Sequence, residues 1–212
     1  MILSKLKALR LIQLLNQSIK KPKTSLKYRN QFTLLTSVVL SAQCTDTNVN
    51  NVTKNIYKKY FTPKHFAGLG ITRIKGMIKS IGLFNMKAKN LYNLSKILVK
   101  KYKNKVPNNF EDLINLPGVG RKTANVVLNA AFNKPTIAVD THVFRVSNRT
   151  GLTKGKNPNQ VEKQLLQILP NKYLKKAHHL ILLHGRYVCK SRNPACTKCV
   201  INKICLYKDK YV

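Results

Sequence analysis

The sequence is poor in acidic residues. Of its 212 residues, 6 are Asp or Glu and 40 are Lys or Arg, which gives a formal net charge of +34. Hydrophobic residues make up 43% of the chain, enough for a folded core, so a disordered basic tail is excluded. A folded, strongly cationic surface predicts a large acidic partner, above all nucleic acid. Alternatively, the Lys richness reflects compositional drift and is spread over every exposed face.

Long apolar segments are also missing. The stretch from Leu34 to Ala42 is interrupted by Thr36, Ser37 and Ser41, so it falls short of the roughly 20 apolar residues of a membrane span. No secretory apolar region is present, and we expect an intracellular, cytoplasmic protein with no membrane partner. Residues 1–23 contain no acid. They are interpreted as a basic amphipathic helix docked on the body, with an organellar targeting peptide as the alternative.

Apolar residues recur with helical spacing through most of the chain. They follow one another at steps of three and four, as in Phe32, Leu35 and Val39. Asn157-Pro158 is typical of a helix start, because proline is tolerated at the first helical position. Only residues 135–139 are β-like, and no internal repeat or low-complexity linker is present. The sequence therefore predicts an all-α fold.

A glycine-rich turn joins a short predicted helix to a longer one within residues 113–124. Gly118 and Gly120 let backbone N–H groups approach an anion without a Cβ in the way, and the next helix adds its positive N-terminal end. The turn is therefore predicted to bind a phosphate. The alternative is a plain turn between two helices, in which glycine provides tightness alone. The spacing fits neither a dinucleotide-binding fingerprint nor a P-loop.

Two residues could supply chemistry. Lys122 follows the glycine turn, where a helix N-terminus, a desolvated pocket and other cations would each favour the neutral amine that acts as a nucleophile. The alternative for Lys122 is an exposed or phosphate-contacting side chain. Asp140 ends the apolar run that begins at Ile137, so it is predicted to be a partly buried carboxylate. The alternative for Asp140 is an N-cap of the helix that begins at Thr141.

The chain has an odd number of cysteines, and four of the five are crowded near its end: Cys189, Cys196, Cys199 and Cys205. Four thiolates so close in sequence can bind one metal centre, but the spacing does not choose between zinc and a [4Fe–4S] cluster. Disulfides are a minor alternative in an intracellular setting. Cations would lie on the loop so formed: Lys190, Arg192, Lys198 and Lys203. The fifth cysteine, Cys44, is expected to pack as a small apolar residue.

Together these motifs resemble the endonuclease III family, helix-hairpin-helix DNA glycosylases with AP-lyase activity. The likeness runs from about Tyr28 to Cys205 and is most specific in residues 40–46, 116–125, 139–145 and 184–186 and in the four-cysteine loop. It implies two helical lobes with a DNA cleft between them. One is a six-helix barrel at 24–134, with the helix-hairpin-helix at about 110–129. The other, the cluster lobe, combines residues 1–23 and 135–212.

The resemblance also implies residue roles. Lys122 would attack C1′ of a damaged nucleotide with help from Asp140, and the four cysteines would hold a [4Fe–4S] cluster. Gln43 and Leu83 would fill the gap left when the damaged base is flipped out of the DNA stack. Further DNA contacts are expected in the hairpin and the cluster loop: Gly118, Gly120, Arg121, Thr123, Lys190, Arg192 and Lys198.

The resemblance further implies a monomer that acts in base excision repair on double-stranded DNA containing damaged bases or abasic sites. It would remove oxidised or ring-saturated pyrimidines through a Schiff base on Lys122. It would then nick the strand 3′ to the abasic site by β-elimination. Two rival hypotheses remain. A sister adenine glycosylase lacks a lysine at the position of Lys122, and a non-catalytic DNA-binding or iron–sulfur scaffold would need neither Lys122 nor Asp140.

Overall fold

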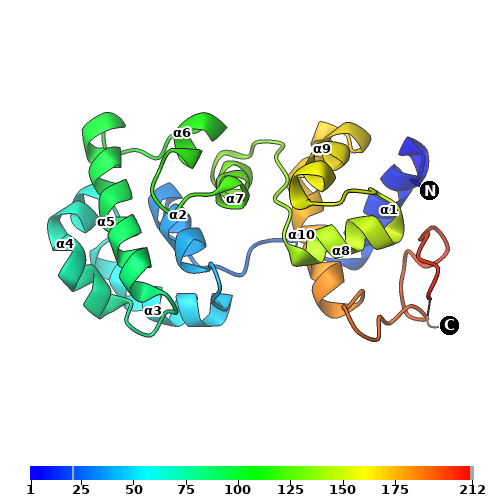
Figure 1. Ribbon diagram of the computed structural model, residues 1–212, viewed down its shortest axis with the longest axis horizontal. Helices are drawn as coiled ribbons and strands as arrows, with labels where there is room; N and C mark the ends of the chain where they lie inside the picture. The colour runs from blue at the N-terminus through cyan, green and yellow to red at the C-terminus, as the bar shows by residue number, and fades with distance from the viewer. Residues whose placement is uncertain (21, 211–212) are drawn as a thin grey trace. The chain divides into compact units, whose positions relative to one another are not determined.

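The computed structural model describes residues 1–20 and 22–210, and these form ten helices and no strand (Figure 1). The predicted all-α fold is confirmed. Lys21, Tyr211 and Val212, which fall within the predicted lobe boundaries, lie outside the described residues. The chain divides into two compact units. We call Ser25–Asn133 the hairpin unit, and Met1–Thr24 with Lys134–Val212 the cysteine unit.

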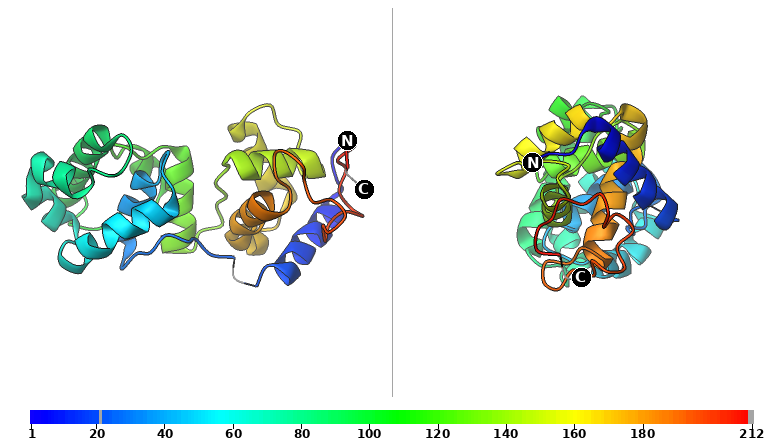
Figure 2. Two further views of the ribbon diagram at one scale, coloured as in Figure 1. Left: turned by 90° about the horizontal axis from the view of Figure 1, so that it is seen from below. Right: turned by 90° about the vertical axis from the view of Figure 1, so that its right-hand side faces the viewer.

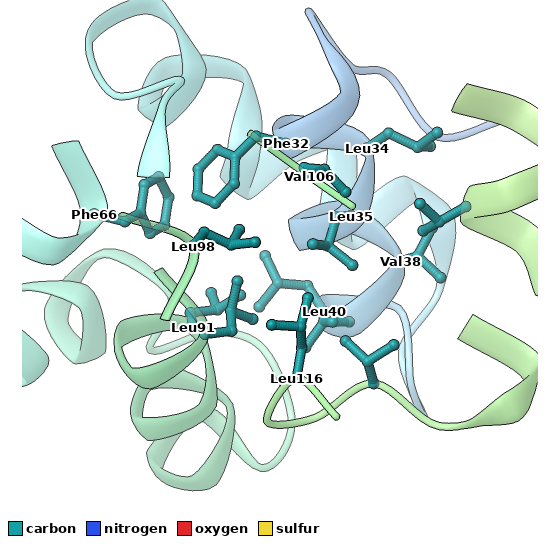
Figure 3. Packing of buried hydrophobic residues seen from close by; sticks show 14 of the residues in the cluster. Phe32, Leu34, Leu35, Val38, Leu40, Phe66, Leu91, Leu98, Val106 and Leu116 are labelled. Carbon is teal, nitrogen blue, oxygen red and sulfur yellow. The ribbon is translucent and has the colours of Figure 1, made fainter. Parts of the chain in front are cut away.

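The hairpin unit contains six helices. They are α2 (Gln31–Leu40), α3 (Asp46–Lys59), α4 (Pro63–Met77), α5 (Phe84–Lys101), α6 (Phe110–Ile114) and α7 (Arg121–Phe132). Nearly all of α2 is buried, because α3, α5 and α7 all contact it. Figure 3 shows this core, where the rings of Phe32 and Phe66 meet edge to face at 5.3 Å. The polar residues of α2 are satisfied inside, since the hydroxyls of Thr36 and Ser37 each lie 2.8 Å from the hydroxyl of Tyr57.

Local chemistry explains where several of these helices begin and bend. Thr45 is the N-cap of α3, and its side chain accepts a hydrogen bond from the backbone N–H of Asn48. Thr45-Asp46 is a typical helix start, with a capping hydroxyl followed by an acidic residue in the first turn. Within α4 the backbone kinks at Gly70, whose φ is +73°. Cys44 is half-buried and packs against the core of the hairpin unit, as expected for a small apolar residue.

The cysteine unit contains α1 (Lys5–Ser18), α8 (Thr141–Thr150), α9 (Pro158–Ile168) and α10 (Asn171–Tyr187). Asn157 caps α9 and Pro158 opens it, as predicted. The basic N-terminal helix α1 buries an apolar stripe in the core of this unit and contacts α10. The described segments nearest both chain ends belong to this unit (Figure 2), and residues 188–210 form turns with no helix. Among the described helices, none combines the length and the apolarity that crossing a bilayer requires.

Candidate functional site

Leu116 and Val119, on either side of Gly118 in the turn between α6 and α7, are 2% and 5% exposed and pack into the core of the hairpin unit. Gly118 has a φ of +80°, and a Cβ there would lie 2.9 Å from Nδ2 of Asn90, so this position requires glycine. Gly120 differs, because its φ is −91° and no atom lies within 4 Å of where its Cβ would stand. Neither backbone shape nor packing requires glycine at position 120. Its effect is to leave the N-terminus of α7 open to an approaching group.

The first turn of α7 carries the other predicted hairpin residues. Gly120 is the N-cap of α7 and supplies no side-chain cap, so the positive end of this helix suits an anion. The guanidinium of Arg121 lies over the ring of Phe110 at 4.9 Å, which links the start of α7 to α6. Thr123 is half-buried beside it. The turn can therefore accept a phosphate through its backbone and first-turn residues.

Lys122 is the second residue of α7, and its side chain is exposed. The buried face of this helix is formed by other residues, among them Ala124, Val127 and Leu128. Among the described residues, none encloses Lys122 in the desolvated pocket that the sequence suggested. The expected position at a helix N-terminus is observed.

Gln43 and Leu83 lie on two neighbouring turns of the hairpin unit. Both are exposed, and both have left-handed backbone conformations, with φ of +52° for Gln43 and +60° for Leu83. The turns approach each other closely: a Cβ on Gly82 would lie 3.8 Å from the carbonyl oxygen of Gln43, and the Asn48 side chain donates to Ser80 O at 3.2 Å. A positive φ is unfavourable for residues with a Cβ and is concentrated at functional sites. The structure thus brings together the two residues predicted to enter DNA.

Asp140 caps α8 in the cysteine unit. Its Oδ1 accepts from the backbone N–H of Val143 at 2.8 Å, so the N-cap alternative is what the structure shows. The carboxylate is half-buried, as predicted, after a buried segment whose carbonyl at Ala138 lies 2.8 Å from Nδ1 of His178. Its second oxygen accepts no hydrogen bond from the described residues. One oxygen therefore holds the helix, and the other is available to a partner.

The four C-terminal cysteines are half-buried free thiols that line one cavity together with His184. Arg149 Nη1 donates to Cys189 Sγ at 3.9 Å, and the backbone N–H of Tyr207 donates to Cys205 Sγ at 3.5 Å. Nε2 of His184 lies 3.6 Å from Cys199 Sγ.

Burial raises the pKa of the Cys199 and Cys205 thiols, and the neighbouring cysteines raise it further. Within the described residues, no three His, Cys, Asp or Glu side chains are gathered closely enough to hold a single metal ion. The predicted cations Lys190, Arg192, Lys198 and Lys203 are all exposed on this loop.

Two arginines of α8, whose roles the sequence did not reveal, hold the start of the cysteine loop. Arg145 donates to the carbonyls of Gly185 at 2.8 Å and Cys189 at 3.1 Å. Arg149 donates to the carbonyls of Lys190 at 2.6 Å and Ser191 at 2.9 Å. Their spacing of four residues, which places both on one helical face, is the pattern that could have identified them.

The class of protein follows from comparison with known families. The family model described as HhH-GPD superfamily base excision DNA repair protein matches residues 36–171. Endonuclease III of Rickettsia prowazekii is 54% identical over 198 residues, 93% of each chain. Endonuclease III of Escherichia coli K12 is 46% identical over 208 residues, 98% of this chain and 99% of the relative.

A solved structure of a trapped endonuclease III–DNA covalent intermediate matches with a TM-score of 0.90 and 41% identity, covering 97% of each chain. The chain belongs to the endonuclease III family.

Proposed function

We propose that this protein excises oxidised or ring-saturated pyrimidines from double-stranded DNA and then cuts the strand 3′ to the abasic site. It is a DNA N-glycosylase and AP lyase of base excision repair and acts on DNA inside the cell. One observation carries this assignment. A lysine stands at the start of α7, directly after a glycine turn left open at Gly120, in a chain of the endonuclease III family.

The proposed reaction uses the Lys122 amine twice. Its nitrogen lone pair attacks C1′ of the damaged nucleotide, and the bond from C1′ to the base breaks with its electron pair passing to the base, which takes up a proton. The ring C1′–O4′ bond then opens, its electron pair and one proton of the nitrogen pass to O4′, and the nitrogen keeps its other proton in a protonated Schiff base to C1′. Loss of a C2′ proton expels the 3′ phosphate by β-elimination. Water finally hydrolyses the Schiff base and restores Lys122.

The surroundings of Lys122 support this role. Since its side chain is exposed and the N-terminus of α7 is open, a DNA strand can reach it without displacing protein atoms. The helix N-terminus attracts the phosphate that precedes or follows the target nucleotide. The trapped covalent complex with DNA in a relative of 41% identity fits a route that needs a protein–DNA bond.

We assign the free oxygen of Asp140 to the assisting role. A carboxylate accepts a proton from the attacking amine or balances the positive charge that develops on the sugar. Its other oxygen bonds the N–H of Val143, which fixes the orientation of the carboxylate. The N-cap and the catalytic role are therefore compatible in one side chain.

Gln43 and Leu83 are assigned to the gap left by the flipped base. Taking a base out of the stack costs a few kcal/mol, and side chains that occupy the gap offset that cost. Both residues are exposed and held in left-handed conformations before DNA arrives. A side chain that is already positioned loses less conformational entropy when it enters DNA.

We assign the four cysteines to a [4Fe–4S] cluster. The four thiols line one cavity, and polar nitrogens of Arg149, His184 and Tyr207 lie within 4 Å of three of the sulfurs. Four thiolates suit either zinc or a [4Fe–4S] cluster, and membership of the endonuclease III family favours the cluster. When bound, the cluster supplies iron–thiolate bonds that hold the helix-free segment. That segment presents Lys190, Arg192 and Lys198 to DNA phosphates.

Borohydride trapping tests the proposal. The protein is incubated with a duplex containing one 5,6-dihydrouracil, a ring-saturated pyrimidine, in the presence of borohydride. Wild type should form a covalent adduct that Lys122→Ala abolishes, while Lys100→Ala, which removes an exposed lysine of α5, should trap normally. Base release without an adduct would favour the adenine-glycosylase type of mechanism. Neither release nor adduct from folded protein would favour a scaffold.

A further inference from the structure

Lys87 of α5 is a buried cation in the hairpin unit. Its side chain is 2% exposed, and none of the described acidic side chains pairs with it. Its Nζ instead donates to the carbonyl oxygens of Leu40 at 2.9 Å and Ala42 at 2.6 Å. Burial lowers the pKa of Lys87, and nearby Cys44 opposes this shift. Placing a lysine here is costly, so its contacts need an explanation beyond packing.

The bond from Lys87 to Ala42 restrains the turn that carries Gln43. The carbonyl of Ala42 belongs to the peptide plane that joins Ala42 to Gln43. The φ angle of Gln43 is the rotation about its N–Cα bond, which sets how this plane is turned relative to the rest of Gln43. A hydrogen bond that fixes this carbonyl therefore restrains the φ of +52°. Leu40 is the last residue of α2, where helix carbonyls lack partners within the helix, and Lys87 supplies one.

The same residue also bonds the turn that carries Leu83. The backbone N–H of Lys87 donates to the carbonyl of Leu83 at 3.0 Å, the first hydrogen bond of α5. Leu83 has no side chain that could cap this helix, and its φ is +60°. Lys87 thus contacts both turns, through its side chain on one and its backbone on the other.

We propose that Lys87 is a positioning residue that holds Gln43 and Leu83 in the arrangement that enters the gap in DNA. The inference rests on the proposed role of these two residues. Lys87 is buried, and among the described residues its Nζ bonds only to carbonyls, so its role is to act through the turns and not on the substrate directly. Removing its charged donors should free the Ala42 peptide plane and let the turn relax to ordinary φ angles.

The test compares Lys87→Met, which keeps the length and removes the donors, with Lys89→Met, which removes an exposed cation from the same helix. Two rates are measured in single turnover: base excision from a duplex with 5,6-dihydrouracil, and cleavage of single-stranded DNA carrying a preformed abasic site. The single strand has no duplex gap for Gln43 and Leu83 to fill, so its cleavage does not depend on their arrangement. Lys87→Met should slow duplex excision about tenfold and leave single-strand cleavage within about twofold of wild type. Lys89→Met should change both rates equally and slightly.

Equal slowing of both reactions by Lys87→Met would overturn the proposal, since it would indicate a general loss of structure. If Lys87→Met does not fold, as judged by thermal melting, Lys87→Gln serves in its place, because its shorter amide keeps a donor. A duplex-specific loss smaller than that expected for Lys87→Met then supports the proposal, and an equal loss on both substrates overturns it.

A double-mutant cycle separates this inference from the assignment on which it rests. Gln43→Ala should itself slow duplex excision, and adding Lys87→Met to it should cost less than about twofold more, because the two residues act as a unit. Full additivity would contradict the proposal. If Gln43→Ala leaves duplex excision unchanged, the gap-filling role of Gln43 fails. If it slows excision but Lys87→Met does not, the role of Lys87 alone fails.

Discussion

The hairpin unit and the cysteine unit hold their candidate residues in place by different means. In the hairpin unit, six helices enclose one apolar core, and backbone packing sets the shape of the turns at Gly118, Gln43 and Leu83. In the cysteine unit, residues 188–210 have no helix, and arginine side chains bond to their carbonyls while Ile201 packs into the core of the unit. Each unit has its own apolar core, and we propose that residues 188–210 of the cysteine unit depend in addition on the cluster assigned to the four thiols.

The largest difference between the units should appear when one cysteine ligand is removed. Cys199→Ser should abolish the visible iron–thiolate absorbance and the hydrogen-exchange protection of residues 188–210, while the helices of the hairpin unit keep theirs. A structural metal centre contributes on the order of 10 kcal/mol to folding, so the effect should be all or none. Cys44→Ser, which changes the cysteine of the hairpin unit, is the matched control and should keep the visible iron–thiolate absorbance. A colourless wild type with stoichiometric zinc would contradict the cluster assignment.

The next effect separates the two roles given to Asp140. Asp140→Asn keeps an N-cap of equal quality, so the melting temperature should not change, but base excision should fall by about 10²- to 10⁴-fold. Asp140→Ala should lose the same activity and also about 1 kcal/mol of stability. The checks are single-turnover excision and thermal denaturation. Full activity in Asp140→Asn would show that capping is the whole role of this residue.

Acid should weaken the cysteine unit before the hairpin unit. Among the described residues, the buried histidines all belong to the cysteine unit, and burial lowers the pKa of His179 from 6.5 to about 4, with His178 adding to the shift. The folded state therefore favours neutral His179. This stability is fully present above pH 6.5 and is lost as the pH falls toward 4, by about 3 kcal/mol.

Hydrogen exchange of the two units, measured across that pH range, checks the sign and the location. His179→Gln should flatten part of the dependence. His184 of the same unit should contribute in the same direction, because burial also lowers its pKa to about 4. Equal loss of protection in both units of wild type would argue against the assignment.

The smallest effect distinguishes the two glycines of the hairpin. Gly118→Ala should cost about 1–3 kcal/mol of stability, because φ is +80° and the side chain of Asn90 stands 2.9 Å from the new Cβ. Gly120→Ala has room and an ordinary φ, so its cost should be about 1 kcal/mol or less, while DNA binding weakens. Denaturation and DNA titration measure the two quantities. Unchanged DNA binding in Gly120→Ala would count against an open phosphate site.

Features that depend on neighbours in the sequence could be predicted. Asn157-Pro158 marks a helix start because a cap and a fixed φ are local properties, and the glycines of the hairpin likewise mark a turn before the structure is known. The roles of Lys122 and Asp140 came from a family resemblance, since the residues alone left an exposed lysine and an N-cap as alternatives. The structure shows both alternatives, an exposed Lys122 and a capping Asp140.

Features that depend on contacts distant in the sequence could not be predicted. The left-handed conformations of Gln43 and Leu83 arise where two turns meet, and no local pattern specifies them. Lys87 and Leu91, four residues apart, both lie on the buried face of α5. The sequence alone therefore shows a cation within an apolar stripe, but it does not show what the cation bonds. Its partners at Leu40 and Ala42 lie more than forty residues away in the sequence, which only the fold reveals.

The most direct test of the account is the position of the covalent bond to DNA. Wild-type protein is trapped with borohydride on a dihydrouracil duplex, digested with nuclease and protease, and mapped by mass spectrometry. The account predicts a sugar remnant on Lys122, at the start of α7 in the hairpin unit. A remnant on another lysine or on the N-terminal amine would contradict it.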